Sequence, residues 1–83
     1  MNMNIQQQVI AIFCDSVEHS VDRDTLDLTM PLKNMPYIDS LTLLKFVSAI
    51  EARYKVSVAM NEVDQVFRSI GSVVAYIEAH HST

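Results

Sequence analysis

Apolar residues in the first part of the chain recur with the spacing of one helical face. They are Ile5, Val9, Ile12, Phe13 and Val17. Steps of about three and four residues return side chains to the same side of an α-helix. Asn4 is a residue type that caps helix starts, and Gln7 completes a capping-box pattern. The pattern therefore predicts a helix from about Ile5 to about Glu18.

The middle of the chain holds a longer helical pattern. We expect this second helix to begin at Asp39 or Ser40 and to end at Tyr54, with Asp39 as a suitable N-cap. Leu41 and Phe46 are expected on the flanks of its apolar stripe. The stripe itself is predicted to consist of Leu43, Leu44, Val47, Ile50 and Tyr54.

Two shorter helical patterns follow. Val56 and Val58 alternate with polar residues and predict an extended connector. Residues 61–67 are then expected to form a short third helix. Its inward side chains are predicted to be Val63, Val66 and Phe67. Ser69 is expected to cap a last helix, whose inner face consists of Ile70, Val73, Val74 and Ile77.

Helical periodicity lapses between His19 and Asp39. Leu28, Met30 and Leu32 alternate there with polar residues or proline, which predicts an extended segment that places every second side chain on the core. Pro31 interrupts this segment and argues against a central strand. A loop of this length in a small protein indicates a functional or packing role.

Together these elements predict an all-α fold. We expect a small four-helix bundle with three longer helices, one short helix and a long first loop. One glycine and two prolines leave few turn residues for an all-β sandwich or barrel. Because the chain has 83 residues, we expect a single domain over residues 1–83. We also expect a monomer.

Charge and hydropathy exclude several classes of partner. Six Lys and Arg residues stand against ten Asp and Glu residues, without a basic cluster, so nucleic acid is not an expected partner. The longest apolar run, residues 9–14, is too short to insert across a membrane. The N-terminus lacks the features of a secretory signal. Cys14, the only cysteine, is expected to be a small buried residue, and the protein is expected to be cytoplasmic.

Few residues are suited to catalysis or metal binding. A hydrolytic triad would need His19 beside Ser40, and no glycine-rich turn supplies an oxyanion hole. Asp22, Asp24 and Asp27 lack the glycine and the bidentate glutamate of a calcium loop. One cysteine is too few for a structural zinc site. We therefore expect no metal and no catalytic residues.

The quartet Ile38-Asp39-Ser40-Leu41, followed by a helix rich in Leu and Val, resembles the attachment signature of acyl carrier proteins and peptidyl carrier domains. Residues 49–58 resemble the end of that family's second helix, and residues 69–77 are similar to its last helix. Order and spacing match from about Leu28 to His80, whereas the first helix fits only by pattern. This context makes the motif far more specific than the tripeptide alone.

The resemblance implies that Ser40 carries 4′-phosphopantetheine through a phosphodiester, with Asp39 as the flanking motif residue and helix cap. The anion would lie at a helix N-terminus, where N–H groups and the macrodipole favour negative charge. A separate phosphopantetheinyl transferase would attach the group, because no activating base is evident beside Ser40. Other implied partners are acyl- or aminoacyl-loading enzymes and synthase or transferase modules. The chain itself would be a carrier and not an enzyme.

Two residues depart from the family pattern. Tyr37 stands where many members have glycine, and Lys45 lies on a helix face that is acidic in fatty-acid-synthesis carriers. With Leu41, these residues are predicted to contribute to partner recognition, although Lys45 equally fits an ordinary solvated helix position.

The pathway is the least specific part of the prediction. Residues 58–64 resemble the corresponding segment of carriers of amino-acid-derived groups, including D-alanyl carrier proteins. We therefore favour a specialised polyketide or nonribosomal peptide pathway. A D-alanyl carrier or a fatty-acid-synthesis carrier is the alternative. An alternative of another class is a small helical interaction module without a prosthetic group, which docks partners through exposed Met35, Tyr37 and Leu41.

Overall fold

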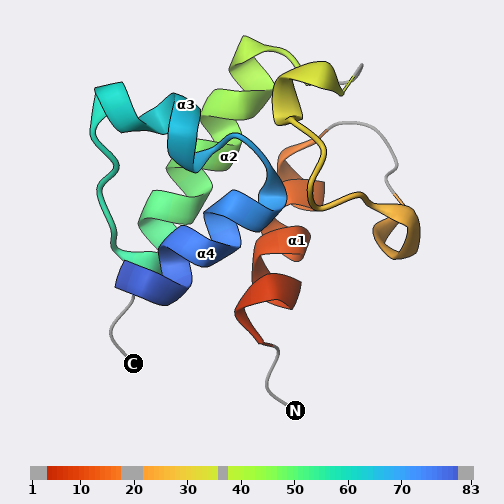
Figure 1. Cartoon of the computed structure of the whole chain (residues 1–83), viewed down its shortest axis with the longest axis horizontal. Coiled ribbons are helices and arrows are strands. Elements are labelled where there is room, and N and C mark those ends of the chain that lie inside the picture. Colours follow the sequence, from red (N-terminus) through yellow and green to blue (C-terminus); the bar gives the residue numbers. More distant parts are fainter. Residues whose placement is uncertain (1–3, 18–21, 36–37, 81–83) are drawn as a thin grey trace.

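The computed structural model describes residues 4–17, 22–35 and 38–80. Every regular element in these ranges is helical (Figure 1). The α-helices are α1 (Ile5–Ser16), α2 (Ser40–Tyr54), α3 (Val63–Val66) and α4 (Ile70–His80). Short 3-10 turns lie at η1 (Arg23–Thr25), η2 (Leu32–Asn34) and η3 (Met60–Glu62). The predicted all-α fold of three longer helices and one short helix is confirmed.

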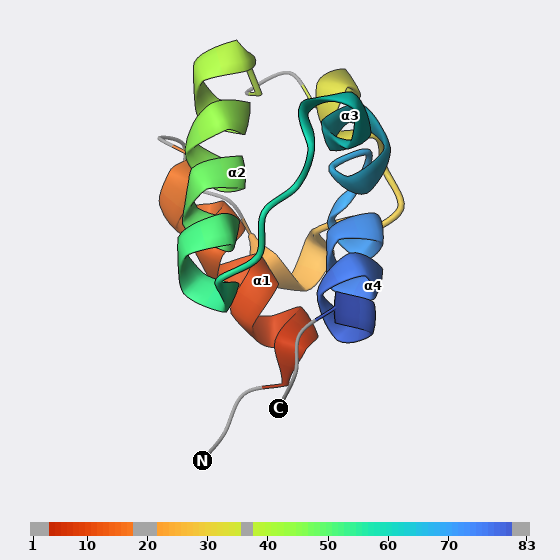
Figure 2. The same cartoon turned by 90° about the vertical axis from the view of Figure 1, so that its left-hand side faces the viewer.

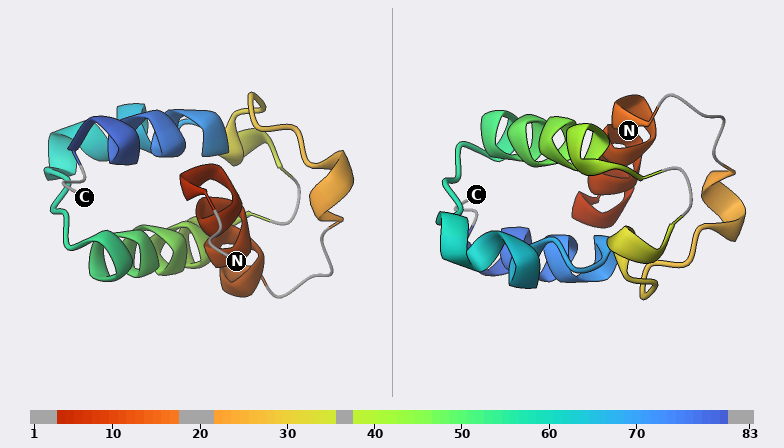
Figure 3. Two further views of the ribbon diagram at one scale, coloured as in Figure 1. Left: turned by 90° about the horizontal axis from the view of Figure 1, so that it is seen from below. Right: turned by 90° about the horizontal axis from the view of Figure 1, so that it is seen from above.

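The longer helices enclose the core from three sides. Helices α2 and α4 lie on opposite sides of the molecule, and α1 packs against both of them (Figure 3). The connector after α2 runs back along the molecule, so that α3 lies at the same end as the first turn of α2 (Figure 2). The turn η2 of the first loop lies at this end as well. Three segments that are distant in sequence therefore gather around the start of α2.

Phe46 is the centre of the core. Its ring is 1% exposed and meets Phe13 of α1 edge to face, with ring centroids 5.3 Å apart. On its other side it meets Phe67 in the same way, at 5.5 Å. Edge-to-face contacts are a favoured arrangement of aromatic rings. The pair of contacts joins α1, α2 and the end of α3.

The predicted apolar stripe of α2 is wrong at two positions. Leu44 was expected in the core but is 61% exposed, whereas Phe46 was expected on the flank and is buried. The buried face contains Phe46, Val47, Ile50 and Tyr54, with Leu43 half-buried beside it. Successive residues are about 100° apart around the helix axis, so Leu44 lies outside the face that these buried residues form. Hydrophobicity alone could not choose between the two leucines and the phenylalanine.

Side-chain caps fix the starts of α1 and α4. Asn4 and Gln7 form the predicted capping box at α1. At α4 the Ser72 N–H donates to Ser69 Oγ at 3.1 Å, and the Ser69 N–H donates to Ser72 Oγ at 3.0 Å, which confirms Ser69 as the cap. Helix α1 ends at Ser16, before the expected Glu18, because Val17 is already extended. Glu18 itself, like His19, lies outside the described residues.

The segment from Leu28 to Leu32 turns instead of extending. The Asp27 carboxylate accepts hydrogen bonds from the Thr29 N–H at 2.9 Å and from Thr29 Oγ1 at 2.7 Å, which stabilises a turn. Leu32 is buried and Leu28 half-buried, but Met30 is 39% exposed, so the expected alternation is wrong there. Turn geometry redirects the middle side chain away from the core.

Two backbone hydrogen bonds attach this loop to the start of α4. The Gly71 N–H donates to Leu28 O at 2.8 Å, and the Leu32 N–H donates to Arg68 O at 2.7 Å. A Cβ atom at Gly71 would lie 3.0 Å from Leu28 O, closer than ordinary contacts. Glycine therefore permits the close approach that holds the loop in place.

The later elements follow the sequence prediction closely. The expected third helix is divided into η3 and α3, and Val66 and Phe67 are buried while Val63 is half-buried. All four predicted core residues of α4 are buried. In the connector, the Val58 N–H donates to Glu51 Oε2 of α2 at 2.9 Å. Cys14 is half-buried, more exposed than expected.

The rotation of α2 can be tested with two substitutions on the same helix. Phe46→Ala should lower the free energy of unfolding by about 3–5 kcal/mol, because it leaves a cavity between two other rings. Leu44→Ala should change it by less than about 0.5 kcal/mol, because the side chain is mostly solvated. Urea denaturation measures both. A larger loss for Leu44→Ala than for Phe46→Ala would contradict the observed packing.

Candidate functional site

Ser40 is the first residue of α2 and is exposed. Asp39 precedes it as the N-cap, and its Oδ1 accepts a hydrogen bond from the Thr42 N–H at 2.7 Å. The Leu43 N–H donates to the Asp39 carbonyl at 3.0 Å. These two bonds fix the start of the helix at the residue that the sequence singled out. An exposed hydroxyl thus stands at the helix end toward which N–H groups point.

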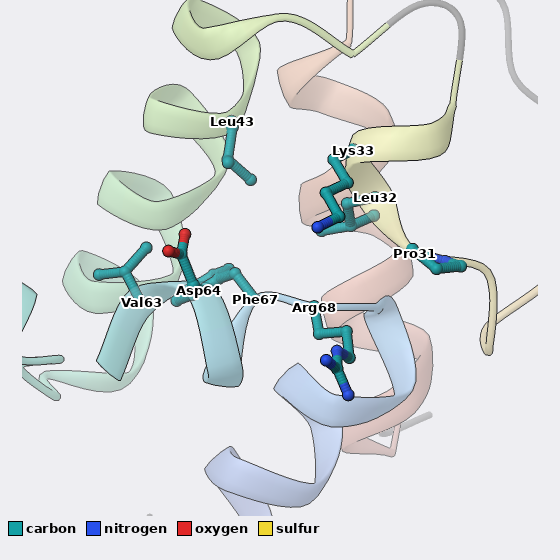
Figure 4. A pocket seen from close by; sticks show the side chains of 8 residues that line it. All are labelled: Pro31, Leu32, Lys33, Leu43, Val63, Asp64, Phe67 and Arg68. Carbon is teal, nitrogen blue, oxygen red and sulfur yellow. The ribbon is translucent and has the colours of Figure 1, made fainter. Parts of the chain in front are cut away.

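A pocket of about 360 Å³ opens beside this end of α2 (Figure 4). Leu43 of α2 faces it, three residues beyond Ser40, which is less than one helical turn. Its other lining residues come from η2, α3 and their neighbours: Pro31, Leu32, Lys33, Val63, Asp64, Phe67 and Arg68. The buried side chains of Leu32 and Phe67 form the apolar part of the lining.

Charged residues surround the mouth of the pocket. Lys33, Asp64 and Arg68 are all exposed. In Figure 4 the Lys33 ammonium and the Asp64 carboxylate come from opposite sides of the opening, from η2 and α3. This pocket could not be predicted from the sequence, because its lining comes from segments that only the folded loop and connector bring together.

The comparisons with known proteins agree with this geometry. The family model described as the phosphopantetheine attachment site matches residues 7–77. The chain belongs to the phosphopantetheine-attachment family. The match extends into α1, which the sequence resemblance had reached only by pattern. Searches of curated proteins and of solved structures gave no significant match.

Family membership identifies the cofactor as covalently attached 4′-phosphopantetheine and the chain as a carrier. The surroundings of Ser40 fit an anionic phosphodiester. The hydroxyl is exposed, and the first turn of α2 contains no acidic residue. A helix N-terminus stabilises negative charge through its N–H groups and macrodipole. The carrier's predicted attachment residue therefore has the environment that the group requires.

Asp39 is the nearest negative charge in the sequence. Hydrogen bonds from the Thr42 N–H and the Thr42 side chain lower the pKa of its carboxyl, and Lys45 adds a smaller electrostatic effect in the same direction. The carboxylate is therefore ionised at neutral pH and is held by the helix backbone. Its charge is partly compensated before any phosphodiester is attached nearby.

The predicted recognition residues do not all lie within the described structure. Leu41 is 62% exposed and Lys45 is exposed, and residues four apart are neighbours on a helix. Tyr37 lies outside the described residues. Leu44, which the sequence prediction assigned to the core, instead shares this face. Its position four residues after Ser40 is the sequence signal that could have placed it on the same face as Ser40.

Other candidate chemistry is separated from Ser40. His80 lies at the last turn of α4, at the other end of the molecule from the start of α2, and stacks on Tyr76 with ring centroids 4.1 Å apart (Figure 1). In the described ranges, no three His, Cys, Asp or Glu side chains are grouped to hold a metal ion. No helix described here is long and apolar enough to cross a membrane.

The electrostatic part of the Asp39 cap can be isolated by pH. Asn is also a good N-cap, so Asp39→Asn keeps the contact geometry but removes the charge. Because the pKa is lowered on folding, the charge stabilises the fold above the ordinary value of 3.8 and ceases to do so as pH falls through the folded-state pKa. The advantage of the parent chain over Asp39→Asn should therefore shrink below about pH 4.

Urea denaturation from about pH 6 to about pH 2 measures this difference. The pKa of Asp27 is also lowered, by hydrogen bonds from Thr29. Because Asp27 is present in both chains, its contribution to the pH dependence cancels in the difference. A difference that stays constant with pH would show that the cap acts through geometry and not through its charge.

Proposed function

We propose that Ser40 is the attachment residue and that the chain carries acyl or aminoacyl groups as thioesters between enzymes. The observation that carries this proposal is the position of Ser40: an exposed serine at the first residue of α2, within the region that the family model matches. When bound, the prosthetic group supplies a flexible arm that ends in a thiol. The protein supplies the anion-compatible helix end and the surface around it.

The carrier depends on other proteins for its chemistry. We propose that a phosphopantetheinyl transferase supplies the base that accepts the Ser40 hydroxyl proton during attachment. We propose that acyl- or aminoacyl-loading enzymes and synthase or transferase modules then act on the arm. We further propose that the chain is a non-catalytic, cytoplasmic monomer with one domain over residues 1–83.

For the pathway, we propose specialised polyketide or nonribosomal peptide synthesis. The first turn of α2 lacks acidic residues, and Lys45 follows in the second turn, which differs from the acidic face expected of a fatty-acid-synthesis carrier. The neighbouring pocket has charged residues at its mouth, which favours cargo with polar groups near the thioester. A D-alanyl carrier shares these features and is the second candidate.

The rival hypothesis of an interaction module without an arm loses one of its residues. Met35 was expected to be exposed for docking, but it is only 3% exposed and belongs to the core. Tyr37 lies outside the described residues, so Leu41 is the remaining docking residue in the described structure. Covalent modification of Ser40 separates the two hypotheses.

Intact mass spectrometry tests the attachment. After incubation with coenzyme A, magnesium and a broad-specificity phosphopantetheinyl transferase, the parent chain should gain one phosphopantetheine. Ser40→Ala should gain none, while its free energy of unfolding changes by less than about 1 kcal/mol, because Asp39 and not Ser40 is the cap. Ser48→Ala, an exposed serine on the same helix, is the matched control and should be modified normally.

No mass gain in the well-folded parent chain with several transferases would favour the interaction module. A gain that persists in Ser40→Ala would move the attachment to another residue.

The contribution of Lys45 to partner choice can be tested by charge reversal. Lys45→Glu should change the relative kcat/KM values for different loading enzymes or synthases, because charges at the edge of an interface mainly affect encounter and partner choice. The effect of one exposed charge is expected to be about 0.2–1 kcal/mol, or roughly one- to fivefold. Steady-state loading assays with at least two partners measure it. If Lys45→Glu leaves kcat/KM the same as in the parent chain for every partner, Lys45 is not part of the recognition surface.

A further inference from the structure

The pocket beside Ser40 combines an apolar floor with a charged mouth (Figure 4). Leu32 and Phe67, which are 1% and 3% exposed, form the floor. Lys33 and Asp64 are exposed and lie on opposite sides of the opening, on η2 and α3. With a volume of about 360 Å³, the pocket lies near the lower end of the usual range for small-ligand sites, about 300–1,000 Å³. It therefore suits a short group that bears charged substituents.

Hydrogen bonds hold the two charged walls of the pocket apart. The Leu32 N–H donates to Arg68 O at 2.7 Å, which fixes η2. On the other side, Ser72 Oγ donates to Val66 O at 2.7 Å and ties the end of α3, the helix that contains Asp64, to the start of α4. Both walls are thus anchored to the segment between α3 and α4. The backbones that carry the two charges therefore keep a fixed separation.

The two charges at the mouth do not neutralise each other. Neither Lys33 nor Asp64 takes part in an ion pair within the part of the chain that the structure describes. The third charged lining residue, Arg68, extends toward α4 in Figure 4 and also lines a separate hollow between α3 and α4. A ligand with one ammonium and one carboxylate complements both charges at the opening. A singly charged ligand is repelled by one of them, and an apolar ligand complements neither.

We propose that Lys33 and Asp64 select the cargo of the carrier: a short acyl group with both an ammonium and a carboxylate, as in an acidic amino acid bound through one of its carboxyl groups. The cargo's ammonium pairs with Asp64 and its free carboxylate with Lys33, while its carbon chain lies on the apolar floor. The inference rests on the proposed attachment at Ser40, because Leu43 places the pocket less than one helical turn from that residue.

Thioester lifetimes test this selection with a matched set of five-carbon groups: pentanoyl, norvalyl, glutaryl and glutamyl. They bear no charge, an ammonium, a carboxylate, and both charges, respectively. A broad-specificity phosphopantetheinyl transferase attaches each group to the chain from its coenzyme A thioester. The protection of a group is its hydrolysis half-life on the chain divided by its half-life on coenzyme A. Glutamyl should be protected about two- to tenfold more than pentanoyl, because two exposed ion pairs hold it in the pocket.

Neutral substitutions assign the role of each charge. Lys33→Gln should lower the protection of glutamyl toward the norvalyl value, and Asp64→Asn should lower it toward the glutaryl value. Glu78→Gln removes an exposed acid of α4 that does not line the pocket, so it is the matched control and should change none of the protections. Because salt screens exposed ion pairs, raising NaCl from about 0.05 to 0.5 M should reduce the glutamyl advantage and leave pentanoyl unchanged.

The outcomes separate the cargo class from attachment itself. A well-folded parent chain that accepts none of the groups from several transferases would overturn attachment. Loaded chains with equal protection for every group, or with greater protection for pentanoyl, would overturn the cargo class and leave the carrier function standing. A glutamyl advantage that survives in both Lys33→Gln and Asp64→Asn would overturn the roles of these residues. Amide NMR shifts at both positions with glutamyl, but not with pentanoyl, provide a readout independent of hydrolysis.

Discussion

The edge-to-face contacts of Phe46 with Phe13 and Phe67 determine the rotation of α2 about its axis. A helix in this position can bury only one side, and the largest side chain sets which side it is. Once Phe46 points inward, Leu44 must point outward and Ser40 lies beside it on the solvent side. The core contact thus decides which residues surround Ser40, the proposed attachment residue. Stability and the site are linked through the same helix, and the core residues Leu32 and Phe67 also line the neighbouring pocket.

The second constraint is the attachment of the first loop to the start of α4. Leu28 and Leu32 are held by backbone hydrogen bonds to Gly71 and Arg68. The absence of a Cβ atom at Gly71 makes the close approach to Leu28 possible. These bonds place η2 opposite α3, and the connector held by Glu51 brings α3 to the same end. The pocket beside Ser40 exists because both segments are fixed there. A long loop that looked irregular in sequence therefore forms one wall of the site.

Local signals in the sequence were sufficient for the helices and for their caps. Asn4, Asp39 and Ser69 each cap the helix that follows, because a cap depends only on residues within one turn. The family resemblance pointed to Ser40 for the same reason, since its motif is contiguous, and attachment at Ser40 stays a prediction. The errors arose where tertiary contacts decide between similar residues. Leu43, Leu44 and Phe46 are all apolar, and only the neighbouring rings of Phe13 and Phe67 select among them. The pocket was missed because its walls are far apart in sequence.

The acidic cap at Asp39 needs a separate explanation, because it stands next to a residue that is expected to become an anion. Two negative charges at this separation repel each other, and Asn would cap the helix nearly as well without that repulsion. The structure reduces the conflict by directing Asp39 Oδ1 at the Thr42 N–H, where the positive end of the helix compensates the carboxylate. The lowered pKa of Asp39 records this compensation. A carboxylate that is held rigidly by the backbone also gives an enzyme a fixed charge beside the hydroxyl, which an amide would not provide. Helix capping explains where Asp39 lies, and the modification proposed at Ser40 accounts for an acid rather than an amide at that position.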